Sequence, residues 1–131
     1  MTYKVLYVDD NDAIRGVVEM CLEVSEKLEV RTCTSGSEAI DIALEWQPDL
    51  ILMDVMMPGI DGITTFKLMK ERPEIRDVNL VFVTARIQKK EIAEYLEIGA
   101  AGVIEKPFVP IKLADQSLYY IEKRSGSAAK S

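Results

Sequence analysis

Residues 50–59 of the chain are LILMDVMMPG, an apolar run that ends on an acid. Its first four residues are all apolar, which is typical of a strand that is buried on both faces. Asp54 follows, and Pro58-Gly59 then signals a turn. A carboxylate at the end of a buried strand is costly to desolvate unless it has a partner. We therefore predict that Asp54 has a chemical role, as a nucleophile.

Five strand-like runs alternate with five helix-like segments along the chain. The strands are predicted at 3–8, 28–34, 50–53, 78–83 and 101–105, and the helices at about 13–25, 35–46, 61–71, 88–98 and 110–123. The connections between them are short. This alternation predicts an α/β fold with a parallel sheet and helices on both of its faces.

Local signals mark the helix ends. Asp12 and Asp61 are predicted N-caps, and Ser35 with Glu38 matches a capping box. Gly99 is predicted to close the fourth helix in a left-handed conformation. Helical spacing also predicts the core-facing positions of the first and third helices, which are Ile14, Val17, Val18, Cys21, Leu22, Ile63, Phe66, Leu68 and Met69.

Composition limits the class of protein. The chain has 131 residues, 48% of them hydrophobic, which suits one domain with one core. Its net charge of −6 disfavours non-specific binding to nucleic acid or to anionic membranes. No apolar run approaches the roughly 18 residues of a membrane span. The first residues lead directly into a strand-like run, so we expect no signal peptide and a cytoplasmic protein.

The residue types that bind structural zinc are scarce in this chain. The chain has no histidine, and Cys21 and Cys33 lack CxxC spacing, which disfavours structural zinc and any histidine-based triad.

Residues 1–124 are predicted to form the domain. Residues 125–131, SGSAAKS, are small and polar, and we predict a flexible tail, a linker stub or an expression scar.

Polar residues with complementary chemistry follow four of the five predicted strands. They are Asp9 and Asp10, Asp54, Thr84, and Lys106. In an open parallel sheet, ligands bind beyond the carboxyl ends of the strands. Three converging carboxylates would repel one another, and a hard divalent cation such as Mg²⁺ or Mn²⁺ would remove that conflict. With a lysine and a hydroxyl beside it, this set could hold a phosphoryl group.

On these residues the chain from about 3 to 124 resembles a response-regulator receiver domain of bacterial two-component signalling, similar to the chemotaxis regulators. The matching motifs are Val8-Asp9-Asp10, LILMDVMMPGIDG around Asp54, Thr84-Ala85, and Lys106-Pro107-Phe108. The resemblance implies a flavodoxin-like (βα)5 doubly wound sandwich, with a five-stranded parallel sheet of order 2-1-3-4-5.

The resemblance also implies roles for single residues. Asp54 would accept a phosphoryl group from a phosphohistidine of a histidine kinase or a histidine phosphotransfer protein. Asp10, Asp54 and the backbone carbonyl of Met56 would bind Mg²⁺ directly, and Asp9 mostly through water. Lys106 would bridge the carboxylates at rest and bind the phosphoryl group afterwards. The hydroxyl of Thr84 would donate to the phosphoryl group, which would draw the loop at Ala85 inward. The Lys106–Pro107 bond is expected to be cis.

One position departs from the family pattern. Val103 stands where many members carry a tyrosine or phenylalanine that swings inward when the domain is phosphorylated. This part of the switch is therefore absent or moved elsewhere, and Tyr95, Tyr119 or Tyr120 could substitute. The fourth helix, fifth strand and fifth helix form the family's usual surface for partners or for a homodimer, and Val103 lies within it.

Three functional classes stay open. The first is a phospho-accepting signalling domain, which is not an enzyme beyond its own phosphorylation and slow dephosphorylation. The second is a degenerate receiver that only binds partners; such a domain would have lost an acid, the threonine or the lysine, and none is lost. The third is a phosphohydrolase that works through its own aspartate. That class would carry a second acid two residues after the nucleophile, where this chain has Met56.

Overall fold

The computed structural model describes residues 2–85 and 88–130, with side chains described as far as Arg124. Strands and helices alternate along it as the sequence predicts. The elements are β1 (Tyr3–Val8), α1 (Asp12–Glu23), β2 (Leu28–Cys33), α2 (Gly36–Trp46), β3 (Leu50–Asp54), α3 (Gly62–Lys70), β4 (Leu80–Thr84), α4 (Lys89–Glu97), β5 (Gly102–Glu105), a short 3-10 helix η1 (Pro110–Lys112) and α5 (Leu113–Lys130).

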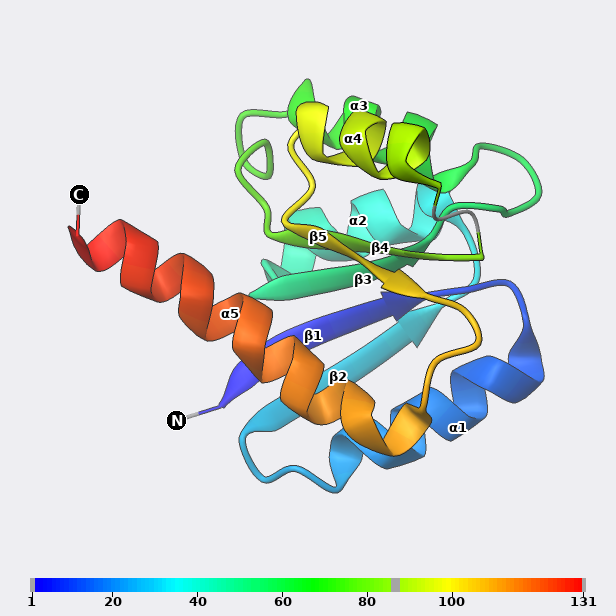
Figure 1. Cartoon of the computed structure of the whole chain (residues 1–131), viewed down its shortest axis with the longest axis vertical. Helices are drawn as coiled ribbons and strands as arrows, with labels where there is room; N and C mark the ends of the chain where they lie inside the picture. Colours follow the sequence, from blue (N-terminus) through cyan, green and yellow to red (C-terminus); the bar gives the residue numbers. More distant parts are fainter. Residues whose placement is uncertain (1, 86–87, 131) are drawn as a thin grey trace.

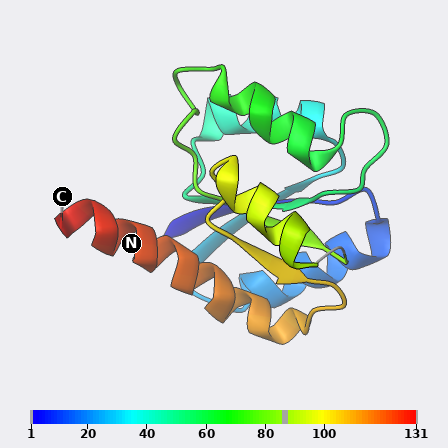
Figure 2. The same ribbon diagram turned by 45° about the horizontal axis from the view of Figure 1, so that its top comes forward.

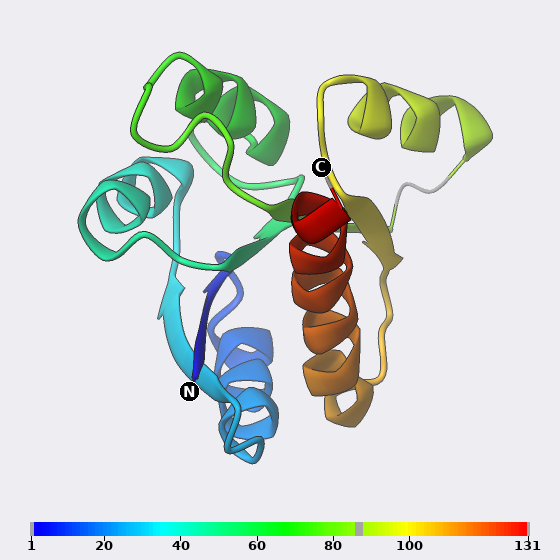
Figure 3. The same ribbon diagram turned by 90° about the vertical axis from the view of Figure 1, so that its left-hand side faces the viewer.

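The five strands form one parallel sheet in the order β2-β1-β3-β4-β5. Helices α1 and α5 cover one face, and α2, α3 and α4 cover the other (Figures 1 and 3). The predicted flavodoxin-like fold and strand order are therefore confirmed. In this topology the central strand β3 lies between β1 and β4, so that its carboxyl end opens onto the middle of one sheet edge.

The apolar run at β3 is buried on both faces, as predicted. Ile51 and Met53 pack into the core beneath α2, α3 and α4. Leu50 and Leu52 pack into a second core beneath α1 and α5. Side chains of a strand point alternately to its two faces, so a continuous apolar run serves both cores at once. Asp54 is the last residue of this strand, and its rigid backbone fixes where the carboxylate lies.

The helix caps agree with the sequence except at α1. Asp61 caps α3 by accepting from the Thr64 N–H at 2.7 Å, and Ser35 caps α2 by accepting from the Glu38 N–H. Gly99 has φ of +108°, the left-handed conformation expected after α4. The prediction that Asp12 caps α1 was wrong. Asn11 is the cap, and it accepts from the Ile14 N–H at 3.0 Å.

Two predicted core residues face solvent. Val17 is 47% exposed and Leu68 is 39% exposed. A helix packed on a sheet buries a stripe only about 100° wide. In α1 that stripe runs through Val18 and Leu22, both fully buried, and it leaves the neighbouring Val17 at its edge. The same reasoning applies to Leu68, which directly precedes the buried Met69 in α3.

Helix α5 is longer in the structure than the sequence predicted, because its backbone stays helical to Lys130. It extends past the edge of the sheet (Figure 2). The start of β1 and the end of α5 lie on the same side of the molecule. The carboxyl ends of the strands lie on the opposite side (Figure 1). The division into a domain of residues 1–124 and a tail of residues 125–131 stays a prediction.

Across the described residues, no helix combines the length and the apolar character that crossing a membrane requires.

Candidate functional site

The sheet brings the predicted site residues to one edge. Asp9 directly follows β1, Asp54 ends β3, and Lys106 directly follows β5. The parallel register pairs Val8 with Met53 and Asp54 with Val83, so neighbouring strands end at the same level. Polar side chains that are 45 to 97 residues apart in the chain therefore meet in space.

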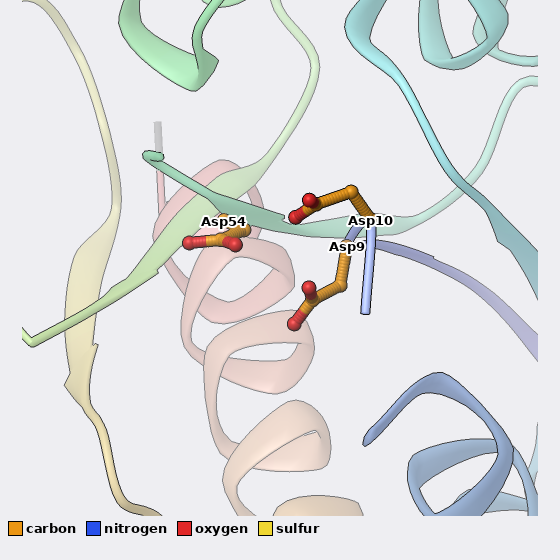
Figure 4. Close-up of side chains that lie close together, drawn as sticks. All are labelled: Asp9, Asp10 and Asp54. Carbon is orange, nitrogen blue, oxygen red and sulfur yellow. The ribbon is translucent and has the colours of Figure 1, made fainter. Parts of the chain in front are cut away.

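Three carboxylates form the centre of this edge. Those of Asp9, Asp10 and Asp54 each offer an oxygen, and these oxygens all lie within 4.8 Å of one another. Figure 4 shows the three side chains lying close together. Asp9 and Asp54 are buried, at 1% and 6% exposure, whereas Asp10 is exposed. Two carboxylates of the cluster are therefore enclosed by the fold, and the third is accessible to solvent.

Lys106 binds two of these acids. Its Nζ lies 3.1 Å from Asp9 Oδ2 and 3.3 Å from Asp54 Oδ2. Three carboxylates and one ammonium, when all are ionised, leave a formal charge of −2. This charge is concentrated in a partly buried place, where charge repulsion is screened less than it is in water.

The surroundings shift the pKa of the buried Asp54 and of the half-buried Lys106. Burial raises the pKa of the Asp54 carboxyl, the nearby Lys106 ammonium opposes that rise, and the Asp9 charge adds to it. Burial works to lower the pKa of Lys106, but its hydrogen bond to Asp9 and the charges of Asp54 and Asp9 outweigh burial and raise it. Lys106 therefore stays cationic, while the ionised form of Asp54 is disfavoured in the fold.

Residues 5–117 match the family described as the response regulator receiver domain. The chain belongs to this family. Receiver domains are signalling domains of two-component systems rather than enzymes, and their partners are histidine kinases.

Known relatives agree with this assignment. The polar-differentiation response regulator DivK of Brucella ovis is 36% identical over 107 residues, which cover 82% of this chain and 86% of DivK. The response regulator PleD of Caulobacter vibrioides is 36% identical over 113 residues, covering 86% of this chain and 25% of PleD. The chain thus spans about a quarter of the length of PleD. The crystal structure of the chemotaxis response regulator CheY4 of Vibrio cholerae shares 29% identity, with a TM-score of 0.83 over 92% of this chain and 99% of CheY4.

The carboxylate cluster of this receiver suits a divalent cation. Its donors are hard carboxylate oxygens, the ligands that Mg²⁺ prefers, and an exposed acid leaves room for the waters that Mg²⁺ keeps. A cation of charge +2 would also balance the formal charge of the cluster. The acidic triad is typical of the Mg²⁺ site of receivers.

The remaining predicted site residues surround this cluster. The backbone N–H of Met56 donates to Asp54 Oδ1 at 3.3 Å. Thr84 is buried at the end of β4, and its carbonyl accepts from the Lys106 N–H at 2.9 Å. Ala85 follows it and is exposed. The Lys106–Pro107 bond is cis, as the resemblance implied.

The predicted switch residues lie away from the carboxylates. Val103 on β5 is half-buried and pairs with Phe82 on β4. Tyr95 on α4 is buried and packs on the ring of Phe82, with ring centroids 5.1 Å apart. Phe82 in turn makes an edge contact with Phe66 on α3, at 5.7 Å. Aromatic rings thus join α3, β4 and α4, while the role of each in switching stays a prediction.

Sequence reasoning missed three residues that hold Asp9. The Tyr7 hydroxyl donates to Asp9 Oδ2 at 2.8 Å, and the Asn11 N–H donates to Asp9 Oδ1 at 3.0 Å. Arg15 Nη1 donates to the Asp9 carbonyl at 3.0 Å. The spacing of Tyr7 and Asp9 is a usable signal, because residues two apart in a strand point to the same face. The other two contacts depend on the loop conformation.

Proposed function

We propose that this receiver accepts a phosphoryl group on Asp54, from a phosphohistidine of a histidine kinase or a histidine phosphotransfer protein, with Mg²⁺ present. One observation carries the proposal. Asp54 is a buried carboxylate at the end of a rigid strand, with an ammonium at 3.3 Å and two further acids grouped around it. An aspartate in such a place can act as a nucleophile toward phosphorus.

The transfer is an attack of the Asp54 carboxylate on the phosphorus of the phosphohistidine. An oxygen of the Asp54 carboxylate forms a bond to phosphorus, and the phosphorus–nitrogen bond of the phosphohistidine breaks. The electron pair of that bond goes to the imidazole nitrogen, which takes up a proton. Lys106 then turns its ammonium to the new phosphoryl oxygens, and the Thr84 hydroxyl donates to another of them.

Cation binding is assigned within the same cluster. Asp10, Asp54 and the Met56 carbonyl would hold Mg²⁺ directly, and Asp9 would hold it through water. When bound, the cation supplies neutralisation of the charge on the transferring phosphoryl group. The family membership and the oxygen donor set support this assignment.

The test uses a small phosphoryl donor. The chain is incubated with acetyl phosphate and Mg²⁺, and its intact mass is measured. The wild type should gain one phosphoryl unit, Asp54→Asn should gain none, and chelation of Mg²⁺ should prevent the gain. Asp41→Asn, which changes an exposed acid on α2, is the matched control and should label like the wild type. Lys106→Ala should weaken labelling or its read-out while the domain stays folded.

Two outcomes would redirect the proposal. Persistent labelling of Asp54→Asn would show that another residue is the acceptor. A wild type that binds Mg²⁺ but takes no phosphoryl group from several donors would favour a receiver that acts only as a binding domain. Dimerisation through α4, β5 and α5 and a cytoplasmic location stay predictions.

A further inference from the structure

Tyr7 is a buried phenol next to the carboxylate cluster. It lies on β1 two residues before Asp9, is fully buried, and packs in the core beneath α1 and α5. Its side chain points to the same face of the sheet as Asp9. The ring therefore extends along the strand toward the cluster, and its hydroxyl donates to Asp9 Oδ2 at 2.8 Å.

Both oxygens of Asp9 are held by donors from the protein. Oδ1 accepts from the Asn11 N–H at 3.0 Å, and Oδ2 accepts from Tyr7 and also from Lys106 at 3.1 Å. Of the two donors on Oδ2, Lys106 is shared with Asp54, whereas Tyr7 is fixed by its packing.

We propose that Tyr7 is a positioning residue for the cation site, and this rests on the proposed function. Its hydroxyl fixes the orientation of the Asp9 carboxylate. It also keeps Asp9 Oδ2 hydrogen-bonded when Lys106 turns away from Asp9 to the phosphoryl group. Without the hydroxyl, departure of Lys106 would leave a buried carboxylate oxygen without a donor, which is costly.

A purely structural tyrosine makes a different prediction. In that case the hydroxyl would donate to Asp9 only because Asp9 is the nearest acceptor. Loss of the hydroxyl would then change the stability of the fold but not the affinity of the domain for a cation. A positioning residue changes the affinity, because groups that orient metal ligands typically alter metal binding when they are removed. Affinity and stability therefore separate the two roles.

The experiment compares Tyr7→Phe with Tyr3→Phe in the unphosphorylated chain. Both variants lose one hydroxyl from β1, and Tyr3 lies at the opposite end of that strand. Mg²⁺ affinity is measured by calorimetry, and the melting temperature is measured in chelator. Tyr7→Phe should bind Mg²⁺ about tenfold more weakly than the wild type, and Tyr3→Phe should bind it equally well. Tyr7→Phe keeps the ring that packs beneath α1 and α5, and its melting temperature shows whether it is folded at the temperature of the titration.

The outcomes distinguish this inference from the proposed function. Equal Mg²⁺ affinity in the wild type and in Tyr7→Phe would overturn the positioning role alone, even if the melting temperature falls. A wild type that binds no Mg²⁺ would overturn both the cation site and the role of Tyr7. A loss of affinity shared by Tyr3→Phe would also overturn it, because the effect would then come from β1 as a whole.

Discussion

Asp54 places a negative charge where the fold disfavours one. Its carboxyl pKa is raised, first by burial and then by the charge of Asp9, although Lys106 opposes the rise. An acid with a pKa higher in the folded than in the unfolded state destabilises the fold at high pH. This penalty is absent below the unfolded pKa, near 4, and grows as the pH rises through the folded pKa. The charge therefore reduces stability at neutral pH while it serves the site.

Asp54→Asn should consequently stabilise the cation-free domain. It keeps the side-chain shape and removes the charge, and we expect the free energy of unfolding at pH 7 to rise by about 1 kcal/mol. Urea denaturation in chelator measures this. The gain should shrink as the pH falls toward 4, where the wild-type acid is protonated as well.

Asp41→Asn on the surface of α2 is the control for this variant and should change the stability little at either pH. Excess Mg²⁺ should reverse the order, since a cation that binds the folded wild type adds stability by mass action. If Asp54→Asn is less stable than the wild type at pH 7 without Mg²⁺, the ion pair with Lys106 outweighs burial.

For single residues, the sequence predicts where the acids lie but not which groups donate hydrogen bonds to them. Asp9, Asp10, Asp54 and Lys106 could be predicted to meet, because each follows a strand and parallel strands end at one edge. The partners of Asp9 could not be predicted in the same way. They depend on the reach of the Tyr7 side chain and on the conformation of the loop after β1. The wrong cap at Asp12 has a similar cause, since Asn11 and Asp12 both favour caps and only the backbone selects between them.

At the scale of elements, the core-facing stripe of each helix could be predicted only in part. Apolar periodicity identifies the face of α1 but not its edges, so Val17 was wrongly placed in the core. Glycine adds a signal that periodicity does not use. Gly16 lies within α1, with open space where a Cβ would stand, whereas a Cβ on Gly62 in α3 would lie 2.3 Å from the Asp54 carbonyl oxygen.

These two glycines should respond in opposite ways to alanine. Gly16→Ala should stabilise the domain by about 0.5 to 1 kcal/mol, because alanine loses less backbone entropy in a helix. Gly62→Ala should destabilise it by about 1 to 3 kcal/mol, because α3 must move away from the backbone of β3. Thermal melting measures both effects. Equal responses of the two variants would mean that α3 can shift freely at its first residue.

For the whole molecule, the layers could be predicted and the strand order needed the resemblance. The fully buried β3 indicates a central strand of the sheet, and the less buried β2 indicates an edge strand. The spacing of the strands along the chain does not determine which strands are neighbours. The end of the domain is harder to predict for a physical reason. Small polar residues tolerate helix or coil, so composition does not mark where α5 stops contributing to the fold.

The contacts of α5 suggest where the domain ends. Ile121 is buried in the core beneath α1 and α5, and the Tyr120 carbonyl accepts from Asn79 Nδ2 at 3.2 Å, which joins α5 to the residue before β4. Arg124 donates to the Asp77 carbonyl. A chain of residues 1–124 keeps all three contacts, and its free energy of unfolding should lie within about 0.5 kcal/mol of that of the full chain. A chain of residues 1–119 loses them and should be destabilised by about 3 kcal/mol or more. Urea denaturation of the three lengths measures the difference, and a large loss in 1–124 would show that residues 125–131 belong to the domain.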